Sequence, residues 1–167
     1  MTPVGVIARL GRAVAYIDAA INACLAEHDL TRGSWDVLAS LRRTGPPHRL
    51  SPTELYLALM RSSGAMTHRL YRLERAGLIK RVTDPEDGRG LLVELTPEGL
   101  ELFDQTVPAH LANERALLQA LSDDEQAQLS GLLHKMLNAF ERDQPTPPPS
   151  GPGGRHKTHR RRARRSR

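Results

Sequence analysis

The sequence predicts a mainly α-helical fold that carries one small β-hairpin. Apolar residues recur at helical spacing over most of residues 4–142, which favours a series of amphipathic helices. Two short runs rich in β-formers, LIKRV (78–82) and LLVEL (91–95), flank the polar segment TDPEDGRG (83–90) and predict a hairpin. Because the chain has only one Trp, three Tyr and two Phe, its core must consist mainly of Leu, Val, Ile and Ala.

The first two helices follow from apolar spacing and from the residues that end them. A long first helix is predicted over residues 4–27. A second helix is predicted over residues 31–43, and it ends before TGPP (44–47), where a glycine and two prolines break the helical pattern.

The segment SPTE (51–54) is a compact helix start. Ser51 can cap the helix, Pro52 suits its first turn, and Glu54 completes a capping box. We expect this third helix to be short, because the segment MRSS interrupts the helical pattern near residues 60–62.

Three further helices are expected. The fourth runs over residues 63–76 and stops at Gly77. The fifth, over residues 96–118, follows the hairpin, and the sixth, over residues 122–142, begins with a second capping box.

A short helix, a tight connection, a second helix and a β-hairpin form the winged helix-turn-helix arrangement. We therefore divide the chain into an N-terminal dimerisation helix (1–30), a winged helix-turn-helix domain (31–96), two C-terminal dimerisation helices (97–143) and a disordered Pro/Gly linker with an Arg-rich tail (144–167). The flanking helices must bury their apolar faces somewhere, and a partner subunit is the natural place.

The charge is distributed unevenly along the chain. The whole sequence carries a net charge of +5, but residues 155–167 hold eight Lys and Arg and no acid. The remaining residues, 1–154, have 16 basic and 19 acidic side chains, a net charge of about −3. If this body binds DNA, it must use a local basic patch, because its overall charge repels the polyanion.

The fourth helix separates into two faces when each residue is placed at about 100° per step. Met66, Leu70 and Leu73 share the side that we expect to face the core. The opposite side carries Gly64, His68, Tyr71 and Arg75, with Thr67 and Arg72 on its two shoulders.

This outer face is suited to the major groove of DNA, which admits one α-helix. Ser62, Ser63 and Thr67 can donate hydrogen bonds to phosphates, and the helix N-terminus adds its own amides. His68 and Arg72 are the candidates for base contacts, since arginine can bridge both acceptors of guanine. The alternative is a solvated amphipathic helix with no DNA contact.

The tip of the hairpin offers a second DNA contact. Arg89 is placed where a wing arginine would enter a narrow minor groove. The alternative is an ordinary turn arginine paired with Asp87, and the two interpretations are compatible.

The segment from SSGAMTHRLYRLERAGLIKR through the Asp/Arg wing to LTPEGLEL resembles the DNA-binding core of the MarR family of bacterial transcriptional regulators. The resemblance extends over roughly residues 5–142. It implies an obligate homodimer that is built from the first and the last two helices and that binds a pseudo-palindromic operator as a sequence-specific repressor. One departure lies in the wing, where Gly88 occupies a place that the family usually gives to arginine.

A ligand site is suggested by charges beside apolar stripes. Arg69 lies at the edge of the core face of the fourth helix, where a charge needs a partner or a ligand. The WDVL stretch resembles the urate-responsive (PecS-like) branch of the family, which implies that Asp36, Arg69 and Arg81 bind an effector. The tryptophan of that branch does not carry over, because the only tryptophan here is Trp35, next to Asp36. Trp35 is included among the candidate ligand-binding residues.

The implied effector is a small anionic aromatic molecule, urate-like or phenolic, whose binding releases DNA. The alternative is a structural Asp–Arg network that ties the wing to the body.

The cysteine, the lack of catalytic motifs and the lack of targeting segments argue against several other functions. The one cysteine, Cys24, permits no intrachain disulfide, and its place on an apolar stripe favours an inert thiol over an oxidant sensor. No catalytic motif, metal-binding spacing or cofactor loop is recognisable, so we expect neither an enzyme nor a bound cofactor. Without a signal-peptide pattern or a membrane-spanning segment, we expect a cytoplasmic, nucleoid-associated bacterial protein. A competing hypothesis is a non-specific architectural protein that binds nucleic acid through its Arg-rich tail.

Overall fold

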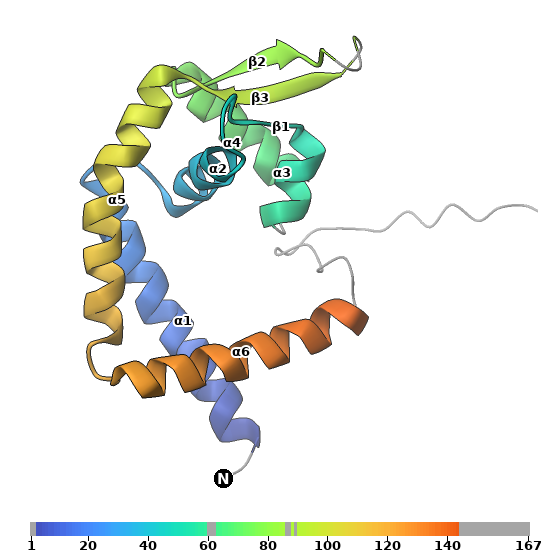
Figure 1. The fold of residues 1–167 in the computed structure, drawn as a ribbon. Helices are drawn as coiled ribbons and strands as arrows, with labels where there is room; N and C mark the ends of the chain where they lie inside the picture. Colours follow the sequence, from blue (N-terminus) through green and yellow to red (C-terminus); the bar gives the residue numbers. More distant parts are fainter. Residues whose placement is uncertain (1–2, 60–62, 86–87, 89, 144–167) are drawn as a thin grey trace, which may run out of the picture.

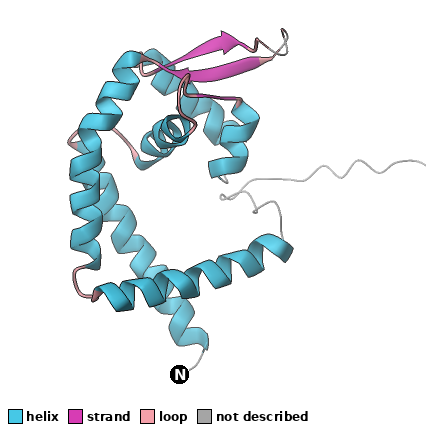
Figure 2. Ribbon diagram, viewed as in Figure 1, coloured by secondary structure: helices cyan, strands magenta, loops and turns pink. Residues whose placement is uncertain are grey.

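The computed structural model of the chain describes residues 3–59, 63–85, 88 and 90–143, and within them it has six helices and one small antiparallel sheet (Figures 1 and 2). The elements in chain order are α1 (Pro3–Ala26), α2 (Arg32–Arg43), β1 (Arg49–Leu50), α3 (Pro52–Leu59), α4 (Ser63–Arg75), β2 (Ile79–Thr83), β3 (Leu91–Leu95), α5 (Pro97–Leu118) and α6 (Asp123–Asp143). The predicted fold class is confirmed, and each predicted helix agrees with the structure to within about two residues at either end.

The sheet differs from the predicted two-stranded hairpin, because β1 adds a third strand. The strand order is β1-β3-β2, with all pairs antiparallel, and Arg49 of β1 lies opposite Glu94 of β3. A two-residue strand is too short to show an alternating pattern, so it gives no periodic signal in the sequence. The third strand joins the hairpin to the segment that leads into α3.

Local capping explains why α3 and α5 begin where they do. The backbone amide of Ser51 donates to Glu54 Oε2 at 2.7 Å, and the amide of Glu54 donates to Ser51 Oγ at 3.2 Å, as the capping box predicts. Thr96 caps α5, because its Oγ1 accepts a hydrogen bond from the amide of Gly99 at 3.0 Å.

The start of α5 is hydrogen-bonded to the turn that follows α4. Thr96 Oγ1 donates to the carbonyl of Gly77 at 2.7 Å, and the Thr96 amide donates to the carbonyl of Leu78 at 3.2 Å. Gly99 is buried against that same carbonyl, with which any Cβ at this position would overlap. The first turn of α5 is therefore held against the turn that links α4 to β2.

The core is centred on α2, which α5, α4 and the sheet enclose (Figure 1). Val37, Leu38 and Leu41 are completely buried, as are Leu25 of α1 and Leu55 of α3. Ion pairs add to this packing at both ends of α2: Arg32 pairs with Asp18 of α1, and Arg42 pairs with Asp104 of α5 at 3.2 Å. Helix α2 thus connects the long helices α1 and α5 with α3, α4 and the sheet.

The long helices leave much apolar surface open. Helix α6 extends from the end of α5 as a separate arm (Figure 1), and none of residues 123–142 is buried. Large apolar side chains of α1 and α6 face outward, including Ile7, Val14, Leu132 (67% exposed) and Phe140 (57% exposed). In the described part of the chain, no helix combines the length and apolar character that crossing a bilayer requires.

Candidate nucleic-acid interface and effector site

Helix α4 has the two faces that its sequence predicts. Met66, Leu70 and Leu73 are buried in the core, whereas the opposite face is exposed. The exposed side chains are Thr67, His68, Tyr71, Arg72 and Arg75, with Gly64 on the same side. Ser63 begins the helix, while Ser62 and Arg89 lie outside the described residues.

The outer face of α4 is cationic and polar. His68, Arg72 and Arg75 are exposed on it, and the Arg75 guanidinium carbon lies 5.9 Å from the centre of the Tyr71 ring. The carboxylate of Glu74 pairs with Arg81 of β2 at 3.2 Å, on a part of α4 that is half-buried. The negative charge of Glu74 is therefore paired with Arg81 and lies beside the exposed outer face of α4.

A buried carboxylate holds the three strands together. The carboxylate of Glu94 on β3 forms an ion pair with Lys80 of β2, whose Nζ lies 2.8 Å from Glu94 Oε1. It forms a second ion pair with Arg49 of β1. The Lys80 ammonium, assisted by Arg49, holds the pKa of Glu94 below its ordinary value against the opposing effect of burial. This cluster is not among the residues predicted from the sequence, where its signal is one acid within the otherwise apolar run LLVEL.

The candidate effector residues Asp36 and Arg69 come from helices that pack on each other. The Arg69 guanidinium lies directly over Gly33 in the first turn of α2, where an added Cβ would overlap its Nε and Cζ and lie 2.8 Å from its Nη2. Asp36 is half-buried one turn further along α2, on the same side as Gly33. The sequence analysis did not single out Gly33, which provides the space for Arg69.

The other two candidate effector residues lie elsewhere. Trp35 is only 7% exposed, and its ring stacks on Phe103 of α5 with centroids 4.4 Å apart and an interplanar angle of 17°. Two residues correspond to about 200° on a helix, so Trp35 faces away from Gly33. Arg81 is on β2, paired with Glu74. The structure thus brings Arg69 to the Asp36 side of α2 and leaves Trp35 in the α2–α5 packing.

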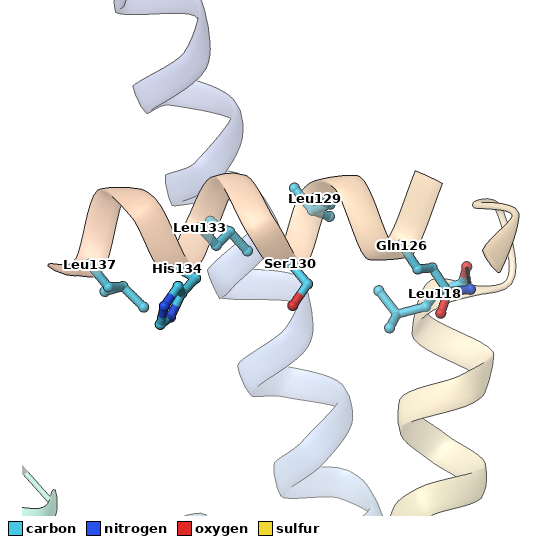
Figure 3. A pocket seen from close by; sticks show the side chains of 7 residues that line it. All are labelled: Leu118, Gln126, Leu129, Ser130, Leu133, His134 and Leu137. Atoms are coloured by element: carbon cyan, nitrogen blue, oxygen red, sulfur yellow. Dashed lines mark hydrogen bonds between the residues drawn. The ribbon is translucent and has the colours of Figure 1, made fainter. Parts of the chain in front are cut away.

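A second candidate site is an apolar hollow at the junction of α5 and α6 (Figure 3). Its volume is about 340 Å³. Its lining consists of Leu118, Gln126, Leu129, Ser130, Leu133, His134 and Leu137. The leucines make it a hydrophobic surface, continuous with the exposed apolar side chains of α6.

Metal binding finds no support in the described residues, where no group of three or more His, Cys, Asp or Glu side chains could hold an ion. Cys24 is half-buried on α1.

An exposed cationic helix, followed by a β-hairpin and framed by long helices, defines a winged-helix DNA-binding protein. The model of the MarR family, described as "MarR family", matches residues 28–90 of this chain. The HTH-type transcriptional regulator PecS of Dickeya dadantii is 37% identical over 134 residues, which cover 80% of this chain and 81% of that protein. The chain belongs to the MarR family of DNA-binding transcriptional regulators.

Solved structures agree with this assignment. A point mutant of MarR from E. coli, complexed with operator DNA, matches with a TM-score of 0.70 and 32% identity, covering 82% of this chain and 99% of that one. BpsR of Bordetella bronchiseptica, in a structure that concerns regulation of its DNA binding by 6-hydroxynicotinic acid, matches with a TM-score of 0.69 and 28% identity. That match covers 76% of this chain and 89% of BpsR.

The Glu94 cluster predicts a pH-dependent contribution to stability. Because the pKa of Glu94 is lowered in the folded state, its contribution is fully present above about pH 4.5 and is lost as the pH falls through the folded-state value. We expect Glu94→Gln to reduce the free energy of unfolding by about 2 kcal/mol at pH 7. The difference from wild type should shrink below pH 4.5, as measured by urea unfolding followed by circular dichroism.

Glu141→Gln, which changes an exposed carboxylate on α6, is the matched control and should leave the unfolding free energy almost unchanged at pH 7. A Glu94→Gln protein as stable as wild type at pH 7 would contradict a stabilising role for the cluster.

Proposed function

We propose that the chain is a sequence-specific repressor that binds a pseudo-palindromic operator as a homodimer and is released by a small anionic aromatic effector. The observation that carries this proposal is the exposed cationic face of α4, opposite a fully buried core face. A protein of this kind acts where the chromosome is, so we place it in the cytoplasm at the nucleoid. Its relatives named here are regulators, and we infer no catalytic role.

The DNA contacts are assigned by position on α4 and the wing. We infer that Ser62, Ser63 and Thr67 contact phosphates at the start of α4, and that His68 and Arg72 contact base edges in the major groove. Arg89, which follows β2 and precedes β3 in the sequence, would enter the adjacent minor groove.

The homodimer follows from the apolar surface of the long helices. Residues 1–30 and 97–143 form the proposed dimerisation segments, on either side of the DNA-binding domain at residues 31–96. Exposed Leu132 and Phe140, together with the hollow beside Leu118, make a surface that a second copy would bury. Two copies would place two α4 helices for the two half-sites of one operator.

The proposed effector site lies between α2 and α4. The Arg69 guanidinium, over Gly33 and on the Asp36 side of α2, would bind the anionic group. Arg81, paired with Glu74, would act on this site only through α4. Trp35 contributes indirectly, by fixing α2 against Phe103. The match to BpsR, whose DNA binding is regulated by 6-hydroxynicotinic acid, supports an aromatic acid as the class of ligand.

The Arg-rich tail supports a second candidate function, non-specific architectural binding. Its eight basic residues would add affinity that depends steeply on salt and little on sequence. We assign the tail an accessory role, because α4 already presents a face suited to the major groove. The tail lies outside the described residues, so this assignment rests on its composition.

The DNA-binding proposal is tested by fluorescence anisotropy of residues 1–144 and of the full chain. The probe is the DNA upstream of the protein's own gene, and a scrambled duplex at about 0.15 M salt is the control. We expect the truncated chain to prefer the native duplex. Arg72→Ala should reduce this preference about tenfold, whereas Arg89→Ala should weaken binding to both duplexes more evenly. Equal, weak binding of residues 1–144 to both duplexes would favour the architectural function.

The dimer is tested by a charge within its proposed interface. Leu132→Glu places a carboxylate on the exposed apolar stripe of α6, and we expect it to convert the dimer to monomers in sedimentation velocity. Ala127→Glu, on the opposite side of the same helix, should remain dimeric. A dimeric Leu132→Glu protein would exclude this stripe from the interface.

The effector site is tested with urate and 6-hydroxynicotinic acid as the compounds added to a protein–DNA complex. Asp36→Ala and Arg69→Ala should bind DNA normally but need about tenfold more compound for release. Gly33→Ala should have the same effect without removing a charge, because its methyl group displaces the Arg69 guanidinium. Gly11→Ala, with open space around it on α1, is the control. A normal response in Asp36→Ala and Arg69→Ala proteins would refute the site.

A further inference from the structure

Tyr71 places a large aromatic ring on the outer face of α4. Its side chain is 53% exposed. At about 100° per residue, it lies about 140° from the direction of buried Met66, beside Gly64 at about 160°, Arg75 at about 180° and His68 at about 200°. Thr67 and Arg72 lie on the shoulders, at about 100° and about 240°. The ring therefore belongs to the group of side chains that faces away from the core.

Arg75 contacts this ring. Its guanidinium carbon lies 5.9 Å from the ring centre, one helical turn beyond Tyr71. A cation over the face of an aromatic ring is attracted to it, so the two side chains lie on the same part of the outer face. At the other end of the same line, a Cβ at Gly64 would meet no atom within 4 Å, so nothing in the described chain obstructs this face there.

The chemistry of the pair points to two different parts of a duplex. The only apolar group that a base presents in the major groove is the C5-methyl of thymine, and an aromatic ring is a suitable surface for it. Arg75 is the last residue of α4, and the end of a helix that enters the groove by its N-terminus lies nearest the sugar–phosphate backbone. The neighbouring side chains, the cation of Arg72 and the hydrogen-bonding imidazole of His68, favour nucleic acid over a protein partner at this face.

We propose that Tyr71 is a specificity-determining residue that contacts the methyl group of a thymine in each operator half-site, while Arg75, stacked on its ring, contacts a phosphate. This inference rests on the proposed function, since it requires α4 to enter the major groove. It adds a preference for thymine that neither His68 nor Arg72 explains.

The first test replaces thymine by uracil, which removes only the methyl group. An operator is obtained with the full chain by selection from random duplexes, and each symmetric pair of thymines is then replaced in turn. When the one thymine pair that contacts Tyr71 is replaced, we expect the Kd of the wild-type protein to rise about fourfold per half-site. This is the effect of losing one buried methyl group. Tyr71→Ala should bind the thymine and uracil operators equally, whereas Tyr71→Phe should retain the difference.

Two control variants separate this contact from general effects. Tyr16→Ala removes another exposed tyrosine, on α1. Any effect of this change on the proposed dimer alters both Kd values together, so the uracil-to-thymine ratio should stay that of wild type. Arg75→Ala should weaken both operators equally and lower the slope of log affinity against log salt by about one per subunit.

A direct measurement does not depend on any variant. An operator with 5-iodouracil at the sensitive thymine should cross-link to Tyr71 under ultraviolet light, as identified by mass spectrometry of the peptide. Failure of every uracil substitution to change the wild-type Kd, or a cross-link only to another residue, would overturn the inference. Selection that yields no preferred sequence would instead overturn the proposed function.

Discussion

Helix α2 has little surface open to solvent, and its burial constrains every other part of the molecule. Leu38 and Leu41 are fully enclosed, and Trp35 is stacked on Phe103 of α5. The burial of each such side chain stabilises the fold by about 1.5–3 kcal/mol. Because protein interiors are close-packed, a displacement of one buried element is transmitted to its neighbours. Helix α2 and α5 therefore move together. The hairpin follows them, because Thr96 at the start of α5 is bonded to the carbonyls that precede β2.

This arrangement explains how an effector at one small contact could control DNA binding. One side of α2 is fixed to the long helices, while Gly33 on another side meets Arg69 of α4, the helix that carries the proposed DNA-binding face. A ligand that binds Arg69 more tightly in one position of α4 than in another shifts the population towards that position. In the proposed homodimer, the two half-sites of an operator would require a fixed spacing of two α4 helices, so a small displacement of α4 would weaken binding.

Much of the fold could be predicted from sequence, because the signals for its helices are local. The box formed by Ser51 and Glu54 identifies a helix start from neighbouring residues alone, and the helical spacing of α4 predicts its outer face. Contacts between distant segments have no such signal. The pairing of β1 with β3 and the place of Arg69 over Gly33 depend on distances that only the packed chain determines. For the same reason, the exposure of Tyr71 was predictable, whereas its stacking with Arg75 depends on rotamers that spacing does not specify.

The distribution of charge explains why sequence preference and general affinity would belong to different segments of such a regulator. A body with a net charge of about −3 repels DNA at long range, so its favourable contacts are short-range and depend on how well α4 fits the groove. Within the sheet, Lys80 and Arg49 are occupied by Glu94 and so contribute less to attracting phosphates. The basic tail would supply the missing long-range attraction through counterion release, which is indifferent to sequence. If the two roles are divided in this way, added salt should weaken binding to all duplexes by weakening the contribution of the tail. The ratio of the affinities for operator and scrambled DNA should depend on α4 instead.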